Sequence, residues 1–207
     1  MKLAESDQTQ LLAIFNKGVG KSAEKLSVLC GMPWKINIIS LDVGTGERFL
    51  SILARDTREY FGAVFSSPGE RYLVLFSEES GRALLNASFP ANDGKPQILP
   101  NIEQSALAEI ANVLINGLSG ELADRQGMIR VLSAPTTAWD KKAAIYDRAF
   151  SALSFDEAMV DVLIHISSPQ LAADCTVMLR LDALNANFLL HTEPYALSAY
   201  LPATIDL

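Results

Sequence analysis

The feature that most constrains the fold is an internal repeat. When Asn16 is laid on Asn112, an offset of 96 residues, the two halves of the 207-residue chain show the same order of predicted elements. Each half begins with a long amphipathic helix, over about 5–29 and about 102–124. Neither half alone would cover its long helix and its sheet face. The repeat therefore predicts a single α/β (α+β) domain with pseudo-two-fold symmetry.

Shorter elements complete each half. The first half has predicted strands over 35–43, 59–67 and 72–77 and helices over 46–54 and 77–87, the latter capped by Ser77. The second half has predicted strands over 128–134, 158–166, 175–182 and 187–191 and helices over 140–153 and near 193–200. The fold class is thus two helix-strand-helix-strand-strand-helix repeats whose sheet packs against the two long helices.

The boundary between the pseudo-repeats, about 1–90 and 102–207, is the Pro- and Gly-bearing segment 90–101, which we interpret as a linker. The strand ends at 76–79 and 191–194 align at an offset of 115. We therefore expect about 19 extra residues in the second half, around 167–175.

Composition excludes several classes of function. Seventeen Lys and Arg face 24 Asp and Glu, a net charge of −7, and no basic run occurs, so neither nucleic acid nor an anionic membrane is an expected partner. The start of the sequence lacks a signal-peptide pattern and no apolar run is long enough for a membrane span, so we expect a cytoplasmic protein. Cys30 and Cys175 lack metal-ligand spacing and are predicted to be buried core thiols.

The second long helix carries an unusual polar line. At about 100° per residue, its members fall within roughly 80° of one another and opposite the apolar side, so the line is predicted to face outward. The members are Ser105, Glu109, Asn112, Asn116 and Ser119. A solvated helix face is the simplest interpretation, although Asn is a poor helix former.

The spacing of these residues resembles the signature of the CheC and CheX chemotaxis phosphatases. That signature is Asp or Ser, three residues, Glu, two residues, Asn, twenty-two residues and Pro, and Ser105, Glu109, Asn112 and Pro135 match it. The segment 16–27 also resembles the family's Asn-x-Gly-x-Gly-Asn-Ala segment, with Lys21 and Ser22 as departures. The resemblance extends over nearly the whole chain through the order of elements.

The resemblance implies an activity: hydrolysis of the aspartyl phosphate of a CheY-like response regulator. Asn112 would align the attacking water, and Glu109 would form a salt bridge with the regulator's Lys. Ser105, Asn116 and Pro135 would flank or extend the docking face. No cofactor of the protein's own is implied, because the regulator supplies Mg²⁺, and no metal ligands are expected.

The chemistry of the side chains agrees with this role. An Asn carboxamide cannot take up a proton at neutral pH, so it is no general base, but it can position water. Hydrolysis of an already activated phosphoryl group needs placement more than proton abstraction.

The first long helix would carry a second copy of the motif, but that copy is broken. Thr9 and Ala13 occupy the leading and Glu positions before Asn16, and Ile39 occupies the Pro position. We therefore expect one working site, on the second helix.

Alternatives remain open. The leading one is a non-catalytic chemotaxis or flagellar adaptor that binds a response regulator, CheD or the flagellar switch; CheD is a second implied partner, since some family members bind it. A small-molecule-binding α/β domain is the other. The segment 18–22 lacks the first Gly of a P-loop, so nucleotide binding is not expected. His165 and His191 are interpreted as core or strand-end residues.

Overall fold

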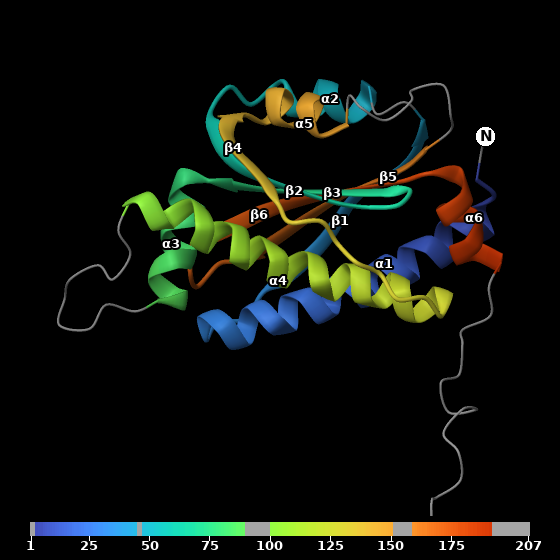
Figure 1. The fold of residues 1–207 in the computed structure, drawn as a ribbon, viewed down its shortest axis with the longest axis horizontal. Coiled ribbons are helices and arrows are strands. Elements are labelled where there is room, and N and C mark those ends of the chain that lie inside the picture. Colours follow the sequence, from blue (N-terminus) through green and yellow to red (C-terminus); the bar gives the residue numbers. More distant parts are fainter. Residues whose placement is uncertain (1–2, 45–46, 90–99, 151–158, 192–207) are drawn as a thin grey trace, which may run out of the picture.

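The computed structural model describes residues 3–44, 47–89, 100–150 and 159–191. Both halves run in the predicted order of helix, strand, helix, strand, strand and helix (Figure 1). The first half consists of α1 (Glu5–Cys30), β1 (Lys35–Gly44), α2 (Glu47–Leu53), β2 (Glu59–Ser67), β3 (Glu70–Ser77) and α3 (Glu78–Ser88). The second half consists of α4 (Pro100–Gln126), β4 (Thr136–Lys141), α5 (Lys142–Phe150), β5 (Met159–Ser168), β6 (Ala173–Leu181) and α6 (Ala183–His191).

The described strands form one antiparallel sheet in the order β1-β5-β6-β3-β2-β4. Exchanging each strand for its equivalent in the other half gives the same order read from the opposite edge of the sheet, so a pseudo-two-fold axis passes between β6 and β3. The first strand of each half pairs with the hairpin of the other half: β1 pairs with β5, and β4 pairs with β2. The two halves are therefore interlocked within the sheet, and the predicted pseudo-two-fold fold is confirmed.

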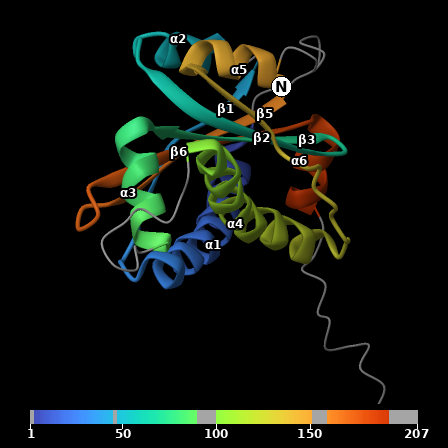
Figure 2. The ribbon, with the colours of Figure 1, turned by 60° about the vertical axis from the view of Figure 1, so that its left-hand side comes forward.

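Helices cover both faces of the sheet. The long helices α1 and α4 lie on one face, with α3 and α6 toward its two ends, and α2 and α5 lie on the other face (Figures 1 and 2). Successive residues of a strand point to opposite faces, so Phe61 and Phe65 of β2 join the core beneath α1 and α4, whereas Tyr60 joins the smaller core beneath α2 and α5. The sheet is thus buried on both sides, and α4 is held as part of the main core.

The helices α1 and α4 run antiparallel and cross closely because small residues meet at the crossing. A Cβ on Gly18 would lie 2.9 Å from Leu118 Cδ1, and a Cβ on Gly117 would lie 2.6 Å from the backbone nitrogen of Ser22. The Ser22 hydroxyl donates a hydrogen bond to the Leu114 carbonyl across the crossing. The glycines of segment 18–22 therefore serve helix packing, as expected for a sequence that lacks a complete P-loop.

Two predicted strands are wrong. Residues 128–134 are not a strand: Ile129 is 94% exposed, and the sheet strand is β4, which begins at residue 136. The segment is mostly apolar and contains the β-branched Ile129 and Val131, which is typical of a strand. It is fixed instead by an ion pair of Arg130 with the buried Glu70 and by Ser133 N–H, which donates to the Ser66 carbonyl at 2.8 Å. Residues 187–191, a run too short to separate strand from helix by periodicity, belong to α6.

The cap of α6 explains the second error. Asp182 Oδ1 accepts a hydrogen bond from Asn185 N–H at 2.7 Å, as Ser77 Oγ accepts one from Ser80 N–H at 3.1 Å in the predicted cap of α3. The equivalent caps are thus 105 residues apart, from 77 to 182. The second half has gained about 9 residues (105 − 96) by this point, and the expected 19 is wrong.

The remaining sequence predictions have mixed outcomes. Asp140 and Lys141, expected to begin a helix, end β4. Residues 90–99 of the expected linker and the helix near 193–200 lie outside the described residues. Cys30 and Cys175 are both free and buried, as predicted. In the described ranges, none of the helices combines the length and the apolar character needed to cross a bilayer.

Candidate functional site

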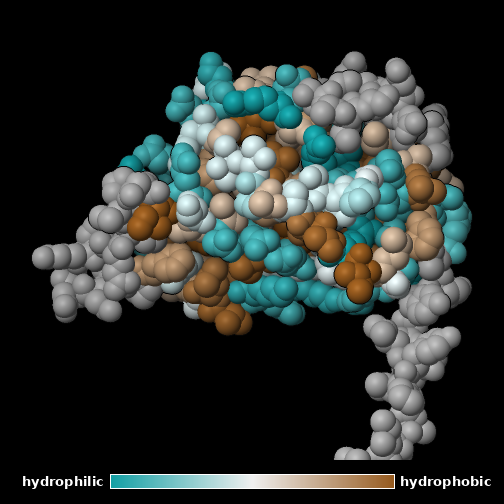
Figure 3. Space-filling view, in the orientation of Figure 1, coloured by the Kyte–Doolittle hydropathy of each residue, from teal (hydrophilic) through white to brown (hydrophobic). Residues whose placement is uncertain are grey.

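The predicted polar line lies on the outer side of α4. Ser105, Glu109 and Asn116 are exposed and Asn112 is partly buried. The opposite side of the helix packs into the main core through Leu107, Ile110, Leu114 and Leu118, which fixes the rotation of the helix about its axis. In Figure 3, hydrophilic side chains cover much of the area over α1 and α4, and apolar ones gather in separate patches toward either side.

Two residues of the sequence pattern lie elsewhere. Ser119, predicted to extend the outward line, is 3% exposed and shares a hydrogen bond with Tyr72, because it stands at the edge of the line nearest the core. Pro135, predicted to end a strand, directly precedes β4 and is partly buried. The structure therefore gathers Ser105, Glu109, Asn112 and Asn116 on one helix and places Pro135 on the sheet side.

The carboxamide and carboxylate groups of this line differ in their partners. Asn116 Nδ2 donates a hydrogen bond to Asn112 Oδ1 at 3.1 Å, one helical turn away. This bond orients the Asn112 carboxamide and leaves its N–H groups and one oxygen lone pair without a partner in the described part of the chain. Glu109 makes neither an ion pair nor a hydrogen bond with any described residue. Both groups are thus available to another molecule.

Buried charge ties α4 to α1 beyond the line. Glu121 is 4% exposed and forms ion pairs with Lys17 at 2.7 Å and with Lys21 at 2.6 Å. Lys21 also pairs with Asp124. The hydrogen bond that Lys21 donates to Glu121 is the largest cause of the raised pKa of Lys21. Together with the close crossing at Gly117, these contacts make α4 a rigid support for the side chains that it presents.

The equivalent surface of α1 lacks the carboxylate. Asn16 and Ala13 are both exposed, so the helix turn before Asn16 presents a methyl group where α4 presents Glu109. Thr9, at the leading position, donates its hydroxyl to the Glu5 carbonyl at 2.9 Å. The broken copy of the motif is therefore a surface of α1 with an isolated carboxamide.

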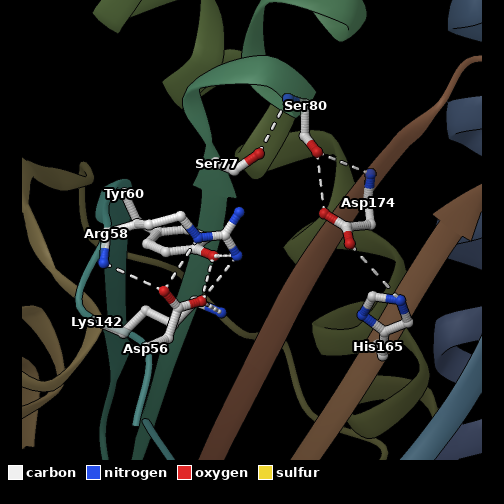
Figure 4. A network of polar contacts seen from close by, with 8 residues as sticks. All are labelled: Asp56, Arg58, Tyr60, Ser77, Ser80, Lys142, His165 and Asp174. Atoms are coloured by element: carbon white, nitrogen blue, oxygen red, sulfur yellow. Dashed lines mark hydrogen bonds and ion pairs between the residues drawn. The ribbon is translucent and has the colours of Figure 1, made fainter. Parts of the chain in front are cut away.

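A separate polar cavity, of about 480 Å³, lies where β2, α3 and the β5–β6 hairpin meet. Figure 4 shows one wall, in which Asp56 is surrounded by Arg58, Tyr60 and Lys142. The Arg58 guanidinium donates to Asp56 at 2.9 Å and the Tyr60 hydroxyl donates to it at 2.6 Å. The hydrogen bond from Arg58 is the largest cause of the lowered pKa of the Asp56 carboxyl.

The other wall of this cavity joins α3 to the β5–β6 hairpin. The Ser80 hydroxyl donates to Asp174 Oδ1 at 2.9 Å, and His165 Nε2 lies 3.9 Å from Asp174 Oδ2 (Figure 4). His165 thus borders a cavity rather than the core. Arg58 and Lys142, which line the cavity, both pair with Asp56. Asp56, Arg58 and Tyr60 are close in sequence, but sequence reasoning missed the cluster because Lys142 and the residues of the other wall come from separate elements.

In the ranges that the structure describes, no three His, Cys, Asp or Glu side chains are grouped so that they could hold a metal ion. The α4 line contains one carboxylate and two carboxamides, which can dock, donate and accept hydrogen bonds and position water.

Comparisons with known proteins identify the fold. No family model matches the sequence, and no curated protein matches it. Among solved structures, FliY from Thermotoga maritima has a TM-score of 0.67 at 13% identity, with 91% of this chain and 96% of that one covered. The FliM middle domain from H. pylori has a TM-score of 0.64 at 11% identity, covering 91% and 98%.

A CheC-like superfamily protein from Shewanella sp. PV-4 has a TM-score of 0.51 at 12% identity, covering 82% of this chain and 97% of that one. The matches also include structures of FliG–FliM and FliM–SpeE complexes from H. pylori. The chain thus has the fold that CheC-like proteins share with FliM and FliY, which confirms the predicted CheC-like fold.

Proposed function

We propose that this chain, built on the CheC-like fold, is a phosphatase of the aspartyl phosphate of a CheY-like response regulator. The observation that carries the proposal is the availability of Glu109 and Asn112. They stand one turn apart on the outer side of a rigid helix, and Glu109 has no partner among the described residues. A helix edge with these two groups can enter a partner's active site, and the reaction places the protein in the cytoplasm with the regulator.

The reaction needs little from this chain. Water attacks the phosphorus, the bond between phosphorus and the aspartyl oxygen breaks, and the products are inorganic phosphate and the free aspartate. The Asn112 carboxamide would accept a hydrogen bond from the water and hold it in line with the leaving oxygen. Glu109 would pair with the regulator's Lys, while the regulator's own Mg²⁺ balances the charge on the phosphoryl group.

The hydrogen bond from Asn116 supports this division of roles. Because Asn116 Nδ2 occupies one lone pair of Asn112 Oδ1, the carboxamide is held before the partner arrives, and less ordering is needed on binding. Ser105 extends the same face by one turn toward the helix start, where it would contact the partner beside Glu109.

The test is the decay of a purified phosphorylated CheY-like regulator in Mg²⁺, alone and with this protein. We expect faster decay with the wild type, a loss of about 10²-fold in the stimulated rate for Asn112→Ala with binding kept, and weaker binding as well as turnover for Glu109→Ala. The matched control is Asn16→Ala on α1, which removes an exposed Asn that lacks a neighbouring Glu and should leave the rate unchanged. Equal rates for Asn112→Ala and wild type would refute the role of Asn112.

A second candidate function is a non-catalytic adaptor, and one observation favours it. The TM-scores of FliY and FliM, 0.67 and 0.64, exceed the 0.51 of the CheC-like protein, and H. pylori FliM forms complexes with FliG and SpeE. An adaptor would bind the regulator, CheD or a flagellar switch protein without changing the decay rate. Unchanged decay with several regulators, together with measurable binding, would establish this alternative.

A further inference from the structure

A second cavity, of about 310 Å³, lies between α5 and strands β2, β3 and β4. It is on the opposite face of the sheet from α4 (Figure 1). Its described lining carries two arginines, Arg71 and Arg148, and several hydroxyl groups, but no carboxylate. Its size is at the lower end of the range for small-molecule sites, which begins near 300 Å³.

The strand register explains why these residues meet. Ser66 of β2 stands directly opposite Arg71 of β3, and Val64 of β2 stands opposite Thr136 of β4. Residues two apart on β2 point to the same face, so Val64 and Ser66 both face α5, whereas Phe65 between them enters the core beneath α4. The hydroxyl of Ser133 joins them, since it accepts from Ser66 N–H at 3.0 Å.

Arg71 is the unusual member of this group. Its Nη1 donates to the Ala149 carbonyl at 2.6 Å, at the end of α5. Its Nε is buried and has no hydrogen-bond partner in the described part of the chain. No described carboxylate pairs with it. The side chain as a whole is partly buried, and a guanidinium has five N–H donors and stays charged, so a partner of opposite charge is normally found beside it.

The neighbouring arginines show the contrast. Arg180, opposite Arg71 in the β3–β6 register, is paired with Asp161 at 2.6 Å, and Arg148, across the cavity, is paired with Asp140 at 2.6 Å. Each of these two has its own carboxylate. Arg71 lies between them without a carboxylate among the described residues, and its unpartnered Nε–H and the hydroxyl groups of the lining are close to the same cavity.

We propose that this cavity binds a small organic anion whose carboxylate or phosphate head group is held by Arg71. The hydroxyl groups of Ser66, Ser133 and Thr136 complete the polar end of the site. Val64 and the buried Ile145 form an apolar wall beside it, which fits a short hydrocarbon body. This site is independent of the proposed phosphatase function, because it uses none of the α4 residues.

The experiment follows the arginine Nε–H signals of the ¹⁵N-labelled full chain by NMR during titration with sodium phosphate and with sodium butyrate, against sodium chloride at equal ionic strength. We expect saturable shifts of the Arg71 Nε–H and of the Ser66 and Ser133 amides with at least one probe. Arg71→Gln should weaken binding by at least about tenfold. The matched control Arg55→Gln, which removes an exposed charge elsewhere, should leave binding unchanged.

Two further variants keep the test decisive. Ser66→Ala keeps the charge of Arg71 and should by itself weaken binding several-fold. It therefore tests the site even if Arg71→Gln fails to fold. Asp156 and Glu157 follow α5 in the sequence, and the double variant Asp156→Asn with Glu157→Gln tests whether the chain supplies its own anion. The proposal would be overturned if the double variant bound a probe and the wild type bound neither. It would also be overturned if chloride produced the same shifts, or if neither probe produced any.

Discussion

Replacing Gly117 by Ala tests how the crossing of α1 and α4 supports the site. A Cβ at this position would overlap Ser22 Oγ and would lie 2.6 Å from Ser22 N and 2.8 Å from Ser22 Cα. Two of these atoms belong to the backbone, so rotation of a side chain cannot relieve the clash and the helices must separate. Gly120, one turn further along α4, has nothing within 4 Å of the same position and is the matched control.

The two substitutions should change the free energy of unfolding in opposite directions. Ala in a helix is favoured over Gly by about 0.8–1.0 kcal/mol, which is the gain expected for Gly120→Ala. Overpacking of a core contact costs about 1–3 kcal/mol, so Gly117→Ala should lose up to about 2 kcal/mol net. For a domain of this size, 1 kcal/mol corresponds to about 2–4 °C in Tm.

Urea unfolding followed by circular dichroism measures both free energies, and thermal unfolding gives Tm. The separation of the helices should also displace Asn112, so Gly117→Ala should lower the stimulated decay of the phosphorylated regulator more than Gly120→Ala does. Equal stabilisation by the two substitutions would refute the argument, because it would mean that the crossing has room for a methyl group at Gly117.

Three further predictions concern other contacts. Asn116→Ala removes the hydrogen bond to Asn112 Oδ1 and should lower the stimulated decay rate about 2–5-fold without a change in Tm; a rate equal to that of wild type would show that Asn112 needs no support. Arg180→Met leaves Asp161 buried without its cation and should cost about 3–5 kcal/mol in urea unfolding, whereas the double variant with Asp161→Leu should recover much of it. Burial raises the pKa of Asp161, and loss of Arg180 raises it further. An acid with a raised pKa in the folded state favours folding at low pH and loses that contribution as the pH rises, so the stability lost in Arg180→Met should shrink toward about pH 4. A loss of stability that is independent of pH would contradict this. Cys30 and Cys175 have raised pKa values because of burial, so a thiol reagent should modify them at the rate of unfolding rather than at once.

Local patterns predicted most of the fold, and they failed where tertiary contacts decide. The long helices and the strand 59–67 could be predicted because their apolar residues recur with the period of the element, and those residues are the ones that face the core. Residues 128–134 are mostly apolar, as in a strand, yet Ile129 and Val131 face solvent because Arg130 pairs with Glu70. The short apolar run 187–191 could be strand or helix, and the Asp182 cap decides for helix.

The site divides in the same way. Glu109 and Asn112 could be found because their spacing on one helix is a local property. The Arg71 cavity could not, since β2, β3, β4 and α5 bring its members together only through the strand register. In the Asp56 cluster, Lys142 likewise joins the local group of Asp56, Arg58 and Tyr60 only because β4 pairs with β2. Ser119 shows the limit even on a helix, because a residue at the edge of a polar line turns inward when a partner such as Tyr72 is within reach.

The two long helices, although related by the repeat, have taken different roles. The offset of 96 places Gly117 at the position of Lys21 and Lys25 at the position of Glu121, so the ion pair between Lys21 and the buried Glu121 has no symmetric counterpart. The charges of α1 are therefore used to hold α4, and α1 has a methyl group at Ala13 where α4 has its carboxylate. The broken first copy of the motif and this asymmetric ion pair fit a single division of labour, in which α1 supports α4 and α4 presents the polar line.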